Sequence, residues 1–76
     1  MEVYNDTLKY ETSAVEPKPW GFEIPITFYH TSGEEYKFIM AFPAEPVDEE
    51  IQEMVSLCAG KTLAKQLKRE LCLQQK

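Results

Sequence analysis

The residues with the most recognisable chemistry are Ala59-Gly60-Lys61-Thr62, which end like a phosphate-binding loop. A complete loop of this kind has a second glycine five residues before Gly60, where this chain has Val55, and it follows a buried strand. The residues before Gly60 have a helical pattern instead. A glycine that ends one helix, followed by a threonine that caps the next, explains the same four residues. We therefore expect no nucleotide and no other cofactor.

Nucleophilic and metal chemistry both lack necessary partners in this sequence. His30 is the only histidine, and Ser32 beside it is a turn residue with no group to orient the pair. Together with Cys58 and Cys72 it makes three Cys or His side chains, whereas a structural zinc site needs four. We expect the two cysteines to be reduced and to pack as small apolar side chains. The sequence predicts no catalytic residue, no metal site and no enzymatic activity.

The densest group of like charges lies between residues 45 and 53. It has neither the apolar pocket that raises a carboxyl pKa for acid catalysis nor the regular oxygen ligands of a calcium loop. One interpretation is a solvated helix start, where negative charge suits the helix dipole. The other is an acidic surface that binds a basic protein, such as one that normally holds nucleic acid. The acids are Glu45, Asp48, Glu49, Glu50 and Glu53.

The charge changes sign along the chain, whose net charge is −5. Residues 1–60 hold twelve acids against three lysines, and residues 61–76 hold five basic residues against one acid. The basic residues fall mostly on one side of a predicted helix, where they could contact phosphate. No aromatic side chain lies among them, so stacking on bases has no support. The residues of this predicted nucleic-acid surface are Lys61, Lys65, Lys68 and Arg69.

The element that must position these groups is a β-hairpin over residues 22–42. Apolar side chains alternate along both halves, as on a half-buried sheet. A three-residue loop at 31–33 puts glycine in its last, left-handed position and brings the two apolar faces together. A shift by one residue would turn every apolar side chain to solvent, so burial selects this register. The predicted opposite pairs are Phe22 with Phe42, Ile24 with Met40, Ile26 with Phe38, and Phe28 with Tyr36.

Pro25 constrains which strand of the hairpin lies at the edge of the sheet. Proline has no N–H and cannot donate to a neighbouring strand. In the predicted register Pro25 faces Ile39, and its missing donor points away from the 35–42 strand. We therefore expect residues 22–30 to form the edge and residues 35–42 to be more central, with a strand over residues 2–10 beside residues 35–42.

The segments before the hairpin contain turn signals. A turn at Asn5-Asp6 is the alternative to one continuous N-terminal strand. Residues 11–21 are predicted to form a loop, because Pro17 and Pro19 disfavour regular structure. Trp20 is predicted either to cover the end of the core or to anchor a partner.

Two helices are predicted after the hairpin, over residues 47–59 and 62–74, with Gly60 ending the first and Thr62 capping the second. One helix through Gly60 is the alternative, at a cost of about 1 kcal/mol relative to alanine. Apolar residues at helical spacing predict a buried stripe on each helix. These residues are Val47, Ile51, Met54, Val55 and Cys58, and then Leu63, Leu67 and Leu71. The fold class is α+β: a small antiparallel sheet of about three strands with one or two C-terminal helices on one face.

The chain of 76 residues is predicted to be a single small domain, 1–76, in the cytoplasm. It has no signal-like start, no apolar run of membrane length and few cysteines. We predict an acidic protein-interaction module, a regulator or inhibitor of a larger protein, of the kind that viruses and mobile elements encode. Its acids would steer the partner, and Tyr29 and Trp20 would anchor it.

Two alternatives belong to other classes of protein. One is a nucleic-acid-binding accessory protein that uses the basic C-terminal helix. The other is a self-associating structural subunit, a homodimer that pairs through the edge strand or through the open sheet face around Tyr29, Ile39 and Ala41. We expect neither membrane binding nor a small-molecule substrate.

Overall fold

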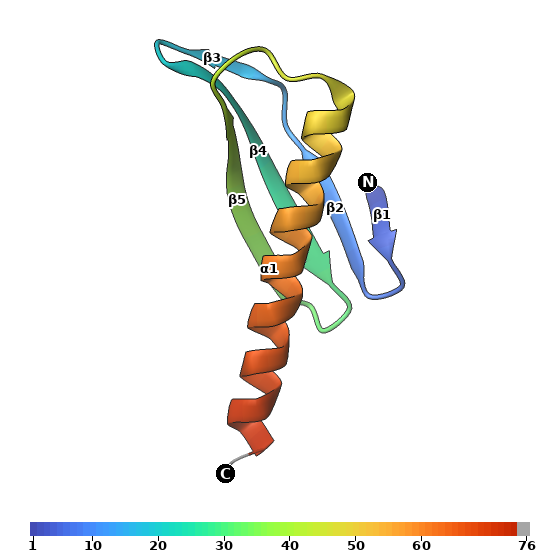
Figure 1. Ribbon diagram of the computed structural model, residues 1–76. Helices are drawn as coiled ribbons and strands as arrows, with labels where there is room; N and C mark the ends of the chain where they lie inside the picture. Colours follow the sequence, from blue (N-terminus) through green and yellow to red (C-terminus); the bar gives the residue numbers. More distant parts are fainter. Residues whose placement is uncertain (75–76) are drawn as a thin grey trace.

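The computed structural model describes residues 1–74, with side chains described as far as Leu71. Five antiparallel strands form one sheet, and a single helix covers one of its faces (Figure 1). The predicted α+β class is confirmed, with more strands than expected. The elements are β1 (Glu2–Asn5), β2 (Leu8–Thr12), β3 (Glu16–Lys18), β4 (Gly21–His30), β5 (Glu35–Phe42) and α1 (Asp48–Gln74).

The predicted register of the central hairpin is confirmed. Phe28 pairs with Tyr36 and Ile24 with Met40, as the three-residue loop requires. The backbone N–H of His30 donates to the carbonyl of Glu34 at 3.0 Å, and that of Gly33 donates to the carbonyl of His30 at 2.9 Å. Gly33 has a φ of 95°, which glycine adopts without a Cβ clash.

The predicted position of the hairpin in the sheet is wrong, because β4 is central and β5 lies at an edge. Both β2 and β3 pair with β4 on the side away from β5. Residues 13–15, which connect β2 to β3, do not continue the strand pairing where they pass Pro25. The Ser13 N–H still donates to the Pro25 carbonyl at 2.9 Å. A central strand tolerates this proline because the neighbouring strand is interrupted where its donor is missing.

The N-terminal region also differs from the prediction. Residues 2–10 do not form one strand beside β5, because a turn after Asn5 separates β1 from β2, and β2 pairs with β4. The Asn5 side chain accepts the N–H of Thr7 at 2.9 Å and so stabilises this turn. Residues 11–21 are not a continuous loop, since β2 runs to Thr12 and β3 includes Pro17. Among the described strands β3 pairs with β4 only, and a strand with one free side tolerates proline.

One continuous helix of 27 residues replaces the two predicted helices. Thr62 is not an N-cap: it is fully buried, and its hydroxyl donates to the Cys58 carbonyl at 2.9 Å. Leu67 and Leu71 are exposed instead of buried, and so is Val47. The buried stripe of the first half continues unbroken through Gln66, because an uninterrupted helix keeps its angular phase. Cys72 has its backbone in α1, and its predicted burial lies outside the described side chains.

The core lies between α1 and the apolar face of the sheet. Phe28 is at its centre, with ring centroids 5.7 Å from Tyr10 and 6.0 Å from Phe38. Two polar groups within the core are satisfied, since the Tyr36 hydroxyl donates to Gln66 at 2.8 Å and Thr62 bonds to its own helix. The buried apolar residues are Leu8, Tyr10, Ile24, Ile26, Phe28, Met40, Phe42, Val55, Cys58 and Ala59.

We expect Phe28→Ala to lower the free energy of unfolding by about 3–5 kcal/mol, because it leaves a cavity beneath α1. Urea denaturation measures this loss. If the alanine variant does not fold, Phe28→Leu is expected to show a smaller loss of the same sign. The matched control is Ile39→Ala on the opposite face, which should change stability by no more than about 0.5 kcal/mol. Equal losses in the two variants would contradict the assigned core.

Candidate protein-binding surface

The acidic cluster, which we define as Glu45, Asp48, Glu49, Glu50 and Glu53, surrounds the start of α1. Val47 caps the helix, since its carbonyl accepts the N–H of Ile51 at 3.1 Å. The Glu50 carboxylate accepts the Val47 N–H at 3.3 Å, which is one half of a capping box. The helix therefore starts at this point for local reasons, and Glu50 has a structural role as part of its N-terminal cap.

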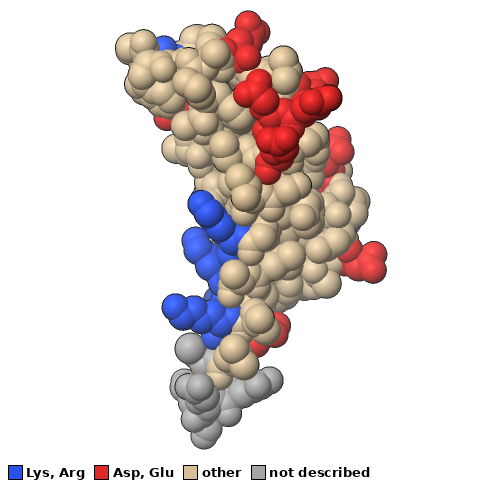
Figure 2. Space-filling model, viewed as in Figure 1, with Lys and Arg blue, Asp and Glu red and all other residues tan. Residues whose placement is uncertain are grey.

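The whole acidic cluster is exposed. Among the described residues, the ion pairs are Lys18 with Glu23 and Arg69 with Glu34, so no member of the cluster is paired with a cation. Figure 2 shows the resulting concentration of acidic side chains over the upper end of the molecule. The cluster predicted from sequence is thus brought together and left open to a partner.

Trp20 lies in the turn between β3 and β4 and is 53% exposed, so it does not form a closed lid over the core. The next residue, Gly21, has a φ of 153°, and a Cβ on it would overlap the carbonyl oxygen of Phe42. This close approach holds the turn against the end of β5, where the linker to α1 begins. The turn between β3 and β4, which contains Trp20, lies at the same end of the molecule as the start of α1 (Figure 1).

Tyr29 is not brought together with the acidic cluster. It lies near the opposite end of β4, where it pairs with Lys9 and Glu35 on the two sides. Its hydroxyl donates to the Glu11 carboxylate at 3.2 Å. Burial raises the pKa of Tyr29 above its ordinary value of 10.0, and the hydrogen bond to Glu11 and the charges of Glu11 and Glu35 raise it further. The two predicted anchors, Tyr29 and Trp20, therefore lie near opposite ends of the sheet.

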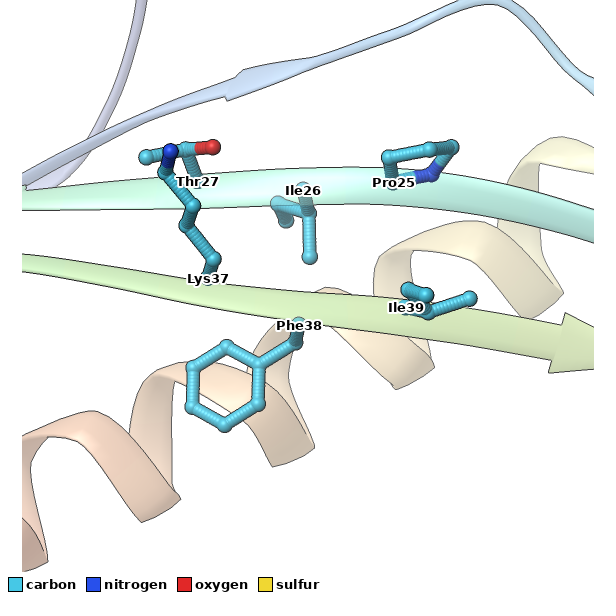
Figure 3. Close-up of a pocket in the computed structure, with 6 residues that line it drawn as sticks. All are labelled: Pro25, Ile26, Thr27, Lys37, Phe38 and Ile39. Carbon is cyan, nitrogen blue, oxygen red and sulfur yellow. The ribbon is translucent and has the colours of Figure 1, made fainter.

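The open face of β4 and β5 contains a shallow hollow of about 540 Å³ (Figure 3). Pro25 and Thr27 contribute to it from β4, and Lys37 and Ile39 from β5, while Phe38 points toward α1. Ile39 is 63% exposed. The far side of β5 pairs with no other described strand, so an apolar surface adjoins a free strand edge. The sequence analysis placed the edge of the sheet at residues 22–30. The strand order shows that the free edge belongs to β5 instead.

Two of the four residues of the predicted nucleic-acid surface already make contacts within the chain. The Lys65 ammonium lies 5.0 Å from the centroid of the Phe38 ring, and Arg69 forms an ion pair with Glu34. Both contacts hold α1 against the β4–β5 hairpin. Lys61 and Lys68 remain for a phosphate ligand, which weakens the predicted nucleic-acid surface.

The remaining reactive groups have local roles. The Ser32 hydroxyl is 2.9 Å from Nδ1 of His30, and the Ser32 N–H donates to the same atom at 3.1 Å, which stabilises the turn. Burial raises the pKa of the Cys58 thiol, and the charge of Lys61 partly opposes this. Among the described residues, no three His, Cys, Asp or Glu side chains are grouped as metal ligands, and no helix is long and apolar enough to cross a membrane.

The candidate surfaces offer charge, exposed apolar groups and a free strand edge. Comparisons with protein-family models, curated proteins and solved structures find no match to the chain. The acidic cluster and Trp20 lie at the same end of the molecule, and they offer exposed charge and an exposed aromatic side chain. Such a combination is suited to binding another protein.

We expect Tyr29 to ionise at a higher pH than an ordinary tyrosine, and Glu11→Gln to lower its pKa by removing a nearby negative charge. Because the pKa is raised in the folded state, the contribution of Tyr29 to stability is present below pH 10 and is lost as the pH rises through the folded pKa. Tyrosinate absorbance during a pH titration measures both effects. The control is Glu16→Gln, an equivalent change at an exposed acid on β3; a shift of equal size in both variants would contradict the assignment.

Proposed function

We propose that this protein is a small interaction module that regulates or inhibits a larger cytoplasmic protein by binding it through the acidic cluster and Trp20. The observation that carries the proposal is the exposure of five acids, without a cation paired to them among the described residues, at the end of the molecule that also presents Trp20. The partner would have a basic surface with an apolar recess that accepts the indole ring.

Helix stability accounts for only part of the acidic cluster. Asp48, Glu49 and Glu50 lie in the first turn of α1, where negative charge favours the helix dipole. Glu53 lies beyond that turn, and Glu45 precedes the helix. Because the dipole effect falls off within the first turn, these two acids support a role outside the fold.

The acidic cluster and Trp20 are expected to contribute to partner binding in different ways. Exposed acids at the rim of an interface mainly accelerate association with a basic surface, and salt screens this effect. A tryptophan that becomes buried in a partner's pocket contributes mostly to the lifetime of the complex. Binding through both groups should therefore weaken with salt but retain an apolar component.

We expect Glu45→Lys with Glu53→Lys to reduce partner capture from a cell lysate more than about tenfold, because two attractive charges become repulsive. These positions leave the Glu50 helix cap in place. Trp20→Ala should reduce capture by a similar factor or more. Quantitative mass spectrometry of the retained proteins at low and high salt measures both effects.

The matched control is Glu2→Lys with Glu35→Lys, which makes the same change in net charge on β1 and β5, away from the acidic cluster and Trp20. Capture by this control should be close to that of the natural chain. The proposal fails if no partner is retained at low salt, or if all three variants retain it equally.

A further inference from the structure

The outer edge of β5 carries backbone groups with which no described strand pairs. The N–H of His30 donates to Glu34, so these two residues form a hydrogen-bonded pair, and such pairs alternate along an antiparallel ladder. Tyr36, Phe38 and Met40 therefore bond to β4, whereas the residues between them direct their N–H and C=O groups away from it. The residues with outward backbone groups are Glu35, Lys37, Ile39 and Ala41, and all four are exposed.

A free edge of this kind favours an extended polypeptide as its ligand. Donors and acceptors repeat along β5, and an extended chain satisfies both kinds by adding a strand. The hollow on the open face adjoins this edge, so side chains of an added strand would lie beside Ile39. A nucleic acid lacks the peptide groups that complete a sheet, and its phosphates would use only the charges near the edge.

Basic side chains border the β5 edge on both faces of the sheet. Lys37 lies on the open face, where it lines the hollow. On the helix face the Lys65 ammonium lies 5.0 Å from the centroid of the Phe38 ring, which places this side of α1 beside β5. Lys61 and Lys68 are one helical turn from Lys65 and so share its side of α1. Basic side chains gather on the left of Figure 2, the side on which Figure 1 shows β5.

Most of this positive charge is not neutralised within the described part of the chain. Of the basic residues near the edge, only Arg69 forms an ion pair among the described residues, with Glu34. The contact with Phe38 leaves the charge of Lys65 in place, since an aromatic ring carries no net charge. The strand itself contributes one acid, Glu35. The four lysines around the edge outnumber this acid, so the edge favours an acidic ligand.

The same lysines disfavour a second copy of the chain as the ligand. Two β5 strands paired antiparallel would place both helices on one face of a continuous sheet, with the lysines of both copies at the joint. Like charges across a strand pairing are destabilising, and lysine on an edge strand commonly prevents self-association. Lys37 alone provides such protection on the strand, whereas Lys61 and Lys68 extend the basic surface onto the side of α1 that adjoins the edge.

We propose that the β5 edge binds an extended acidic segment of another protein as an additional antiparallel strand. The segment alternates acidic side chains, directed toward the lysines of α1, with apolar side chains, directed toward Ile39 on the open face. The antiparallel direction matches the rest of the sheet and is the more stable pairing. This site takes a ligand of opposite charge to the basic partner of the acidic cluster, so it does not rest on the proposed function.

The probe is a synthetic peptide as long as β5, with blocked ends and alternating glutamate and valine residues. Calorimetric titration of the full chain should show one peptide bound per chain, with an affinity that salt weakens. A peptide with lysine in place of glutamate, and a single-stranded oligothymidylate, should each bind at least about tenfold more weakly. Absence of binding by the glutamate peptide at low salt, or tighter binding of the oligonucleotide, would overturn the proposal.

Backbone methylation of the peptide tests the strand pairing separately from charge. Opposite residues of an antiparallel pair share a face, so the valines lie opposite Lys37 and Ile39 and donate their N–H groups to β5. N-methylation of the valines should abolish binding, whereas N-methylation of the glutamates should change the dissociation constant by less than about threefold. The reverse result would indicate a parallel strand and overturn the arrangement. Equal binding of the two methylated peptides would mean attraction by charge alone and would overturn the strand pairing.

Charge reversal on α1 locates the acidic side of the bound segment. Lys61→Glu and Lys68→Glu, made separately, should each raise the dissociation constant of the glutamate peptide more than about threefold. The matched control is Lys9→Glu on β2, which makes the same change in net charge away from β5 and should leave the constant unchanged. Equal effects of all three variants would contradict the placement of the acids beside α1.

Ile39→Pro tests the edge itself. The substitution removes an outward N–H but no donor to β4, so circular dichroism should show a folded chain that no longer binds the peptide. Ile39→Ala keeps the N–H and should still bind. If the proline variant does not fold, the methylated peptides decide the pairing. Undiminished binding by a folded proline variant, or a dimer of the natural chain that this variant dissociates in sedimentation velocity, would overturn the proposal.

Discussion

The structure depends on one strand, β4, which pairs on both sides and is buried on one face. Its alternation of apolar and polar residues allows only one register with β5, because a shift by one residue would move Phe28 from the core to solvent. Its other side is shared by β2 and β3, which divide where Pro25 cannot donate a hydrogen bond. The interruption at residues 13–15 thus lies where the central strand lacks an N–H donor.

The apolar face of β4 and its neighbours determines which side of α1 is buried. The helix packs Val55 and Cys58 against this face and continues in the same phase to Thr62 and Gln66. The two polar side chains are accommodated because each has a hydrogen-bond partner, and the described residues contain no buried side-chain polar atom without one. Contacts of Lys65 with Phe38 and of Arg69 with Glu34 extend the attachment toward the end of the sheet.

The proposed function relies on groups that lie on surfaces the core leaves free. The acidic cluster and Trp20 lie at one end, the hollow beside Ile39 lies on the open sheet face, and the exposed side chains of Leu57, Leu67 and Leu71 lie on the outer side of α1. The side chains on these surfaces are charged or apolar, which suits the interaction module proposed above.

The sequence by itself determined the α+β class, the hairpin register and the acidic start of the helix, because alternation, loop length and capping act between residues close in the chain. It could not determine that β4 is central, since Pro25 is compatible with an edge or with a broken neighbouring strand, and only the long-range pairing of β2 and β3 distinguishes these cases. It also assigned Leu67 and Leu71 to the core, because their spacing alone does not say which face of a helix meets the sheet. Tertiary structure decided that α1 runs unbroken through Gly60, and a continuous helix keeps the phase that buries Thr62 and Gln66 and turns those leucines outward.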